Sequence, residues 1–433
     1  MNNERAIIDW RVTRPREGAN IRGSMQENLP INTNIRSRMA GSLEPWLAGH
    51  APLMSLAHLV LEAGFNFLPV TYVLLIPKLG LTYGQIGTLA LLSALAGTLT
   101  QPLFGWLSDR GDPRVIVIGS LVWGGVLMGL VGFMPSYGAL GVLLVLAAIG
   151  SAAFHPPAAA LSSLTEARNR GRAMSLFSVG GNLGAALSPA LVGLALGAVG
   201  LASTAVVIPL SLITAFLLAR RLRGLDPAAR RPPVETVAGI DPIAAGGIAA
   251  LLAIVAVVGA RSYFQLALMT YLPEWLRSDG QSLAMAGAAL AIFMVAVSAG
   301  SLFGGSLSDR FGRLPVIALS LVLMMVGHWL MMTLAGWPQM AAVVLVGLMI
   351  GASFPVTIVL AQEAWPRSVG FASAMVMGLG WLPAGLGAWV VGAIADRSTL
   401  TDGLQSLMFV PLVGLAALGV YAYARPRVRV RSR

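Results

Sequence analysis

The stretch GWLSDR at residues 105–110 recurs as GSLSDR at residues 305–310, at an offset of 200 residues. Each copy ends a long apolar run and leads into a short polar turn. Phe154 and Phe354 match at the same offset. Three glycines of the first half match three of the second half at an offset of 199 residues: Gly171, Gly181 and Gly193 with Gly370, Gly380 and Gly392. We infer that one structural unit has been used twice, as in membrane proteins built from parallel repeats.

The composition is that of a membrane protein. Of 433 residues, 56% are hydrophobic and only 11% are charged, whereas a soluble domain carries roughly 25% charged residues. Such a chain cannot cover a water-facing surface, which excludes a soluble enzyme. Since one spanning helix needs about 20 apolar residues, the long apolar runs leave room for about twelve helices. The runs are continuous rather than alternating, which excludes an outer-membrane barrel.

The apolar runs, bounded by charged residues or by Gly and Pro clusters, predict an all-α membrane protein with twelve transmembrane helices in two six-helix bundles. We place these helices at residues 50–77, 82–108, 114–134, 138–164, 171–197, 200–221, 243–272, 282–308, 314–334, 338–361, 369–395 and 403–424. The predicted domains are a polar N-terminal arm (1–48), a first bundle (49–221), a cytoplasmic linker (222–242), a second bundle (243–424) and a basic tail (425–433).

The distribution of positive charge predicts the orientation. The chain has a net charge of +11 and 29 Lys and Arg residues. All but four of them lie in the arm, in the tail or in loops on one side of the predicted bundles; the exceptions are Lys78, Arg261, Arg277 and Arg397. Because basic loops stay in the cytoplasm, we expect a multi-pass protein of the cell (inner) membrane with both termini cytoplasmic. The positive charge is therefore explained by the orientation in the membrane and does not indicate nucleic-acid binding. The arm is not expected to be a signal peptide, because it lacks an apolar core.

Motifs for catalysis and cofactor binding are missing from the sequence. The chain has no cysteine, so it contains no disulfide and no thiolate metal site. It has no His-Glu-x-x-His metal motif, no Gly-x-Ser-x-Gly nucleophile elbow and no Walker phosphate loop. We therefore predict no catalytic residue, no metal site, no cofactor and no enzymatic activity.

The second copy of the repeated motif, extended to Gly305–Arg313, follows the pattern Gly-x-Leu-x-Asp-Arg-x-Gly-Arg. This pattern resembles the loop motif of the major facilitator superfamily, and the resemblance covers about residues 50–424. Within the superfamily the chain is similar to the fosmidomycin resistance group, which exports drugs, in His58-x-x-x-Glu62, QPLFGW (101–106), GSAAFHP (150–156), GGNLG (180–184) and Arg261-Ser262. The resemblance implies two bundles that rock about a central site, driven by a proton gradient. Because the chain has no nucleotide-binding loop, the transport is expected to be secondary.

The resemblance also implies a role for the repeated motif. It implies a latch between the two halves on the cytoplasmic side, which holds the outward-open state. Its members are Gly105, Asp109, Arg110 and Arg114 in the first copy and Gly305, Asp309, Arg310 and Arg313 in the second. Glycine allows helices to approach closely, and aspartate accepts hydrogen bonds from arginine or from a helix N-terminus. Alternatively, the arginines act only as topology signals.

Ionisable side chains inside the membrane are costly and are usually functional. Glu62 lies near the middle of the first predicted helix, and Arg261 lies near the middle of the seventh. His58, Glu62 and Asn66 are spaced by four and share one helix face, and His155 lies at a similar depth in the fourth helix. The superfamily plan lines a central cavity with helices one, four, seven and ten, so we expect Glu62 and Arg261 to meet there. The alternative is a buried pair that only fixes the two helices.

Glu62 is the predicted proton-coupling carboxylate, because a group in such a place can bind a proton in one state and release it in another. His58 and His155 would relay protons or donate hydrogen bonds to the substrate. Arg261 would hold an anionic group of the substrate. The other predicted substrate-binding residues are Asn66, Tyr263, Gln265, Asn182 and Trp381. For these polar and aromatic residues, helix packing is the alternative interpretation.

The combined prediction is a secondary active transporter that works by alternating access. It would perform proton-coupled efflux (antiport) of small polar or anionic compounds such as fosmidomycin-like drugs. Proton-coupled uptake (symport) of a small organic anion is the alternative on the same fold, and a non-transporting sensor or an intramembrane enzyme is a third. The expected partners are a small-molecule substrate, protons and the lipid bilayer, with no nucleic acid, and the chain is expected to be a monomer.

Overall fold

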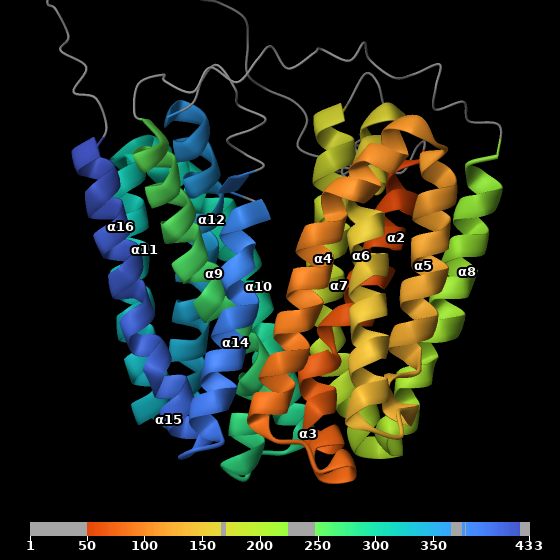
Figure 1. Cartoon of the computed structure of the whole chain (residues 1–433), viewed down its shortest axis with the longest axis horizontal. Coiled ribbons are helices and arrows are strands. Elements are labelled where there is room, and N and C mark those ends of the chain that lie inside the picture. Colours follow the sequence, from red (N-terminus) through yellow and green to blue (C-terminus); the bar gives the residue numbers. More distant parts are fainter. Residues whose placement is uncertain (1–49, 166–169, 224–246, 365–374, 377, 425–433) are drawn as a thin grey trace, which may run out of the picture. The chain divides into compact units, whose positions relative to one another are not determined.

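The computed structural model describes residues 50–165, 170–223, 247–364, 375–376 and 378–424, and the regular elements in these ranges are all helical (Figure 1). The predicted arm and tail, and most of the predicted linker, fall outside the described residues. The first half contains α2 (Ala51–Asn66), α3 (Leu68–Leu79), α4 (Tyr83–Arg110), α5 (Pro113–Gly129), η1 (Val131–Phe133), α6 (Tyr137–Thr165), α7 (Arg170–Val199), η2 (Gly200–Val206) and α8 (Val207–Arg221).

The second half repeats this order of long helices. Its elements are α9 (Gly247–Ser278), α10 (Leu283–Phe311), α11 (Arg313–Thr333), α12 (Trp337–Ala364), η5 (Leu379–Trp381), α14 (Leu382–Ala395), α15 (Leu400–Gln405), η6 (Ser406–Phe409) and α16 (Val410–Ala424). The helices α10, α11 and α12 each begin 200 residues after α4, α5 and α6. The internal repeat read from the sequence therefore sets the spacing of the helices.

The described helices are long and apolar enough for a multi-pass membrane protein. Within the described ranges, ten helical stretches could span a membrane by length and composition, and Leu379–Ala395 is a shorter apolar helix. One of the ten, Ala173–Arg221, contains most of α7 and all of α8, which η2 separates, and η2 begins at Gly200 with its positive φ of 70°. These findings confirm an all-α membrane fold, while the number of twelve spans stays a prediction. Part of the predicted helix 369–395 lies outside the described residues.

The first predicted helix is interrupted near its middle. It was expected to be continuous over residues 50–77, but α2 ends at Asn66 and α3 begins at Leu68. Pro69 stands in the first turn of α3 and has no N–H to donate to the carbonyl four residues earlier. The Thr71 hydroxyl and the amides of Val70 and Thr71 instead converge on the carbonyl oxygen of Phe67. The break lies one turn beyond Glu62, between the two pieces of this span.

The two halves share the same tight packing of a helix against a glycine. A Cβ atom at Gly181 would lie 2.3 Å from the ring of His58, and one at Gly380 would lie 2.5 Å from Val258. His58 and Val258 are equivalent at the 200-residue offset, and the two glycines are equivalent at 199. Both halves therefore keep the close contact at the glycine. The side chain that packs on this glycine is ionisable in the first half and apolar in the second.

The halves contact each other near one end of the helices, where α4 packs against α14 and α7 packs against α10 (Figure 1). A Cβ atom at Gly87 would lie 2.5 Å from the carbonyl oxygen of Ala388, and one at Gly287 would lie 2.3 Å from that of Pro189. Glycine is thus required for the approach of these backbones. Gly87 and Gly287 lie in the first turns of α4 and α10.

The other end of α4 and α10 carries the two copies of the repeated motif, and we call it the arginine-rich end. Apolar side chains of these helices are exposed as they approach it, for example Leu103 at 52% and Leu302 at 77%. The close backbone contacts between the halves lie at the opposite end, from Tyr83 to Leu91 on α4. The two halves are therefore joined at the end that faces away from the repeated motifs.

A carboxylate completes this contact between the halves. Asp396, directly after α14, accepts hydrogen bonds from the backbone amides of Tyr83 at 2.8 Å and Gly84 at 2.9 Å. These amides begin α4, where N–H groups have no partner inside the helix and the helix dipole favours negative charge. The hydroxyl of Tyr271 lies 2.7 Å from the Tyr83 carbonyl oxygen and 3.0 Å from that of Ala388. Polar groups therefore reinforce the contact made by the glycines.

We predict that Gly87→Ala weakens this contact, because the added methyl group would overlap the backbone of α14. Overpacking costs about 1–3 kcal/mol, so the equilibrium constant for the joined arrangement should fall about 5- to 150-fold. The chain has no cysteine, so a bismaleimide that joins cysteines placed at Thr82 and Arg397 reports the contact without background.

The matched control is Gly119→Ala, since a Cβ atom at Gly119 meets nothing within 4 Å. The control should crosslink like the parent double-cysteine chain. Undiminished crosslinking in Gly87→Ala would contradict the requirement for glycine at this place.

Candidate functional site

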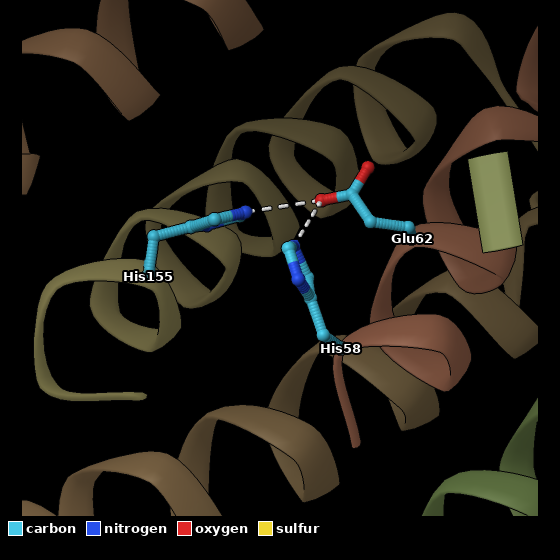
Figure 2. Close-up of side chains that lie close together, drawn as sticks. All are labelled: His58, Glu62 and His155. Atoms are coloured by element: carbon cyan, nitrogen blue, oxygen red, sulfur yellow. Dashed lines mark hydrogen bonds and ion pairs between the residues drawn. The ribbon is translucent and has the colours of Figure 1, made fainter. Parts of the chain in front are cut away.

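Three ionisable side chains of the first half form a cluster between α2 and α6. Glu62 and His58 come from α2 and His155 comes from α6 (Figure 2). The Nε2 atom of His155 lies 3.0 Å from Oε1 of Glu62, and Nε2 of His58 lies 3.7 Å from the same oxygen. Glu62 keeps 23% of its side chain exposed and His155 keeps 31%, so the cluster is half-buried. The spacing of four residues places His58 and Glu62 on one face, as the sequence predicts.

The hydrogen bonds of the two histidines fix where their protons lie. Nδ1 of His155 is 2.8 Å from the carbonyl oxygen of Ser151, and Nδ1 of His58 is 2.9 Å from that of Phe177. A carbonyl oxygen only accepts, so each Nδ1 carries a hydrogen. The 3.0 Å contact between His155 and Glu62 therefore needs one further proton, on the imidazole or on the carboxyl group, because two lone pairs would repel. The geometry thus defines a shared proton.

The surroundings hold the cluster in place. The amide nitrogen of Asn66 donates to Oε2 of Glu62 at 2.9 Å, so both carboxylate oxygens have partners. The ring of His58 stacks on Phe177 with a centroid distance of 4.1 Å. Asn66 was predicted to bind substrate, but in this structure it orients Glu62.

One potential ligand atom from each residue of the cluster lies within 4.8 Å of the others, a spacing that a metal ion can use. The sequence motifs do not reveal this spacing, because His155 comes from another helix. The hydrogen bond between His155 and Glu62 already uses two of these atoms, so the side chains satisfy one another as they stand.

The second half carries a buried arginine in the middle of α9. Arg261 is only 2% exposed. Its Nη1 donates to Oε1 of Gln265 at 3.1 Å, while Nε and Nη2 have no hydrogen-bond partner among the described residues. The guanidinium carbon lies 4.8 Å from the ring centroid of Phe354 and 5.7 Å from that of Trp381. Gln265 and Trp381 thus contact Arg261, and their predicted role in substrate binding stays a prediction.

The expected contact between Glu62 and Arg261 is not formed. The ion pairs of Glu62 are with histidines of its own half, and the hydrogen bond of Arg261 is with Gln265 of its own helix. The packing of the first span explains this difference. Its piece α2 packs against α5, α6, α7 and α8, and its main contacts with α9 come from α3, beyond the break at Phe67. The prediction that acid and base meet across the two halves is therefore wrong for this conformation.

Two further predicted residues lie apart from these groups. Asn182 is exposed on α7 and makes none of the hydrogen bonds described for the Glu62 cluster. Tyr263 is partly buried, and its backbone packs against Gly387 of α14. The neighbouring Ser262 donates to the carbonyl oxygen of Gly380 at 2.5 Å and so helps to join α9 to the segment before α14.

The repeated motif forms local ion pairs at the arginine-rich end. Arg313 pairs with Asp309 and with Glu363 of α12, the latter at 3.1 Å. Arg114 pairs with Asp112 at 2.7 Å. Glu363 and Asp112 are not among the residues that the sequence predicts for the latch. The guanidinium groups of Arg110 and Arg310 lie over aromatic rings in their own segments. The predicted latch between the halves, which includes Asp109, stays a prediction.

The glycine of the second motif makes no close contact in this structure, and its role in the latch stays a prediction. A Cβ atom at Gly305 would meet nothing within 4 Å, whereas one at Gly304 would lie 2.1 Å from the carbonyl oxygen of Ala352. The close contact between α10 and α12 therefore uses the preceding residue, because the two positions point in directions about 100° apart on a helix. At Gly105 a Cβ atom would make an ordinary contact, 3.8 Å from Pro156.

Comparisons with known proteins agree with this architecture. The model of the Major Facilitator Superfamily matches residues 54–279 and 249–433. The fosmidomycin resistance protein of Escherichia coli (strain K12) is 29% identical over 375 residues, which cover 84% of this chain and 91% of that protein. An uncharacterized MFS-type transporter of Bacillus subtilis (strain 168), YfnC, is 28% identical over 378 residues, which cover 84% of this chain and 91% of that protein.

Solved structures share the fold at low sequence identity. A bacterial homologue of the human lysosomal transporter Spinster, in an inward-facing and occupied conformation, has a TM-score of 0.70 at 17% identity and covers 86% of this chain and 96% of its own. A variant of the nucleoside transporter NupG has a TM-score of 0.73 at 13% identity and covers 87% of this chain and 98% of its own. With the family match over both halves, these findings confirm the resemblance read from the repeated motif. The chain belongs to the major facilitator superfamily and is a multi-pass membrane transporter, not an enzyme.

Proposed function

We propose that this transporter is proton-coupled and exports small polar or anionic compounds, fosmidomycin-like drugs among them. The observation that carries the proposal is the 3.0 Å contact between Nε2 of His155 and Oε1 of Glu62, in a half-buried place between two helices of the first half. Protonatable groups inside a membrane protein mark proton pathways in many transporters. The name of the Escherichia coli relative supports export of fosmidomycin.

The orientation that we propose places the arginine-rich end in the cytoplasm of the cell, in the inner membrane, with both termini on that side. The excess of Arg in the loops at this end supports it. The halves are joined at the other end by Asp396 and the glycine contacts. The conformation is then closed toward the outside and faces inward, and the motif at Gly305–Arg313 would act as the latch in the opposite state.

In this proposal the two halves have different tasks. Glu62 binds and releases the coupling proton, His155 and His58 pass it on, and Asn66 orients the carboxylate through its 2.9 Å hydrogen bond. Arg261, with Gln265 and Trp381 beside it, binds an anionic group of the substrate. Tyr263 and Asn182 are further candidates for the substrate path. The transporter works as a monomer, because one chain supplies both sites.

A second candidate is proton-coupled uptake of a small organic anion. The separation of the Glu62 cluster from Arg261 favours it, because substrate and proton then do not compete for one group. An anion on Arg261 would also cancel a buried positive charge, which would favour a bound proton at Glu62 through Coulomb interaction. Export and uptake differ in whether proton and substrate move in opposite directions or together.

We predict that Glu62→Gln abolishes proton-driven transport while the protein still folds and binds substrate. The amide keeps the shape of the side chain and the bond to Asn66 but cannot release a proton. Transport of radiolabelled fosmidomycin into vesicles with an imposed pH gradient should fall to the level of protein-free vesicles. The matched control Asp402→Asn, an acid-to-amide change in the α15 cap, should transport like the wild type. Normal coupling in Glu62→Gln would remove this residue from its role.

We further predict that a fosmidomycin gradient alone makes the vesicle lumen alkaline. With the compound outside and equal pH on both sides, antiport moves protons out as the substrate enters. A pH-sensitive dye trapped in the lumen measures the change, whose sign does not depend on how the protein is inserted. Acidification of the lumen would instead establish symport, and Glu62→Gln should show neither signal.

A further inference from the structure

We propose that Arg261 recognises its ligand through two oxygen atoms that dock side-on against the Nε–Nη2 edge of the guanidinium group. The ligand class is then a small compound with a carboxylate, phosphonate or similar group that presents two neighbouring oxygens. This inference rests on the proposed function, since it specifies how the proposed anion-binding residue selects its substrate.

The two nitrogens of Arg261 that have no hydrogen-bond partner among the described residues share one edge of the guanidinium group. A guanidinium group has a fixed planar fork of five N–H donors, and the hydrogens of Nε and one of those of Nη2 point in the same direction. Nη1, on the other side, is occupied by Gln265 at 3.1 Å. Nε and Nη2 are the two nitrogens without a hydrogen-bond partner in the described part of the chain. This is the edge that binds carboxylate and phosphate groups with two parallel hydrogen bonds.

The charge of Arg261 calls for an anion that the described residues do not supply. The side chain is 98% buried, and a buried charge without a partner costs several kcal/mol. The membrane-embedded acid on the first half, Glu62, is engaged by two histidines and by Asn66. No ion pair to Arg261 is formed by any acid of the described residues. An oxyanion from the substrate would balance the charge and accept one hydrogen bond from each of these two nitrogens, Nε and Nη2.

The neighbours of Arg261 hold its guanidinium group in place. The guanidinium lies over the rings of Phe354 and Trp381, at 4.8 and 5.7 Å, and cation–π contacts of this kind stabilise a cation away from water. Gln265 is 6% exposed and holds Nη1 from one helical turn along α9. Phe354, which the sequence analysis noted only as a repeat match, is therefore assigned as a positioning residue of this site.

A single ammonium group cannot provide the two parallel donors of the guanidinium edge. Lysine keeps the positive charge but offers one ammonium group instead of a planar two-donor edge. A ligand that needs two parallel hydrogen bonds should therefore lose affinity in Arg261→Lys, whereas a ligand attracted only by charge should not.

The test is calorimetric binding to the purified full-length chain in detergent, with phenylphosphonate and benzoate as probes and benzamide as the neutral analogue. Both anions should bind the wild type more tightly than benzamide does. Arg261→Lys should weaken the binding of both anions roughly 10- to 100-fold, the loss expected for charge-assisted hydrogen bonds, with benzamide unchanged. The matched control Arg277→Lys, on the same helix but bonded to the Gln281 carbonyl, should behave like the wild type.

Equal affinity of the anions for wild type and Arg261→Lys would overturn the inference, and so would a wild type that binds neither anion better than benzamide. A thermal unfolding curve that matches the wild type shows that Arg261→Lys is folded. Since Phe354→Leu removes the ring but leaves the charge, it should weaken both anions as well, which a simple point-charge site would not require. Binding that follows these expectations in a chain that does not transport fosmidomycin would refute the proposed function and leave the anion site standing.

Discussion

The cost of keeping a charged side chain away from water is the constraint on which the interior of this protein depends. Glu62 meets it with three partners from its own half: His155, His58 and Asn66. Arg261 offsets this cost only in part among the described residues, through Gln265 and two aromatic rings. The first arrangement is complete without a ligand, and the second is not. A molecule that binds between the halves would thus meet Glu62, whose charge has partners, on one side. On the other side it would meet Arg261, whose charge has no acidic partner among the described residues.

Duplication explains how these two environments arose on one plan. The helices α4, α5 and α6 return as α10, α11 and α12 after 200 residues, and the contact of His58 with Gly181 returns as that of Val258 with Gly380. Phe154 lies 5.9 Å from the ring of His58, and its counterpart Phe354 lies under Arg261. The steric frame has been retained while the ionisable groups have diverged. One copy now carries an acid with imidazoles, and the other carries a guanidinium group.

Sequence reasoning reached the fold because its signals are local or periodic. The repeated motif, the apolar runs and the spacing of His58 and Glu62 depend on helix geometry alone. The choice of partner for Glu62 depends on how the two halves meet, which no pattern along the chain encodes. Two apolar spans can meet at either end, and only the structure reveals that Gly87 and Asp396 join them away from the arginines. Gly305 shows a smaller limit of the same kind, since a one-residue shift around a helix exchanges a contact for open space.

The hydrogen bonds that Asp396 accepts at the start of α4 restrict the substitutions that related sequences can carry. Their donors are main-chain amides, which no substitution at positions 83 and 84 can delete except proline. A Cβ atom at Gly84, however, would lie 2.5 Å from Oδ2 of Asp396. A larger residue at position 84 would therefore be tolerated only where position 396 has shortened or lost its carboxylate. Among relatives that keep this closure, the two positions should covary although they are 312 residues apart.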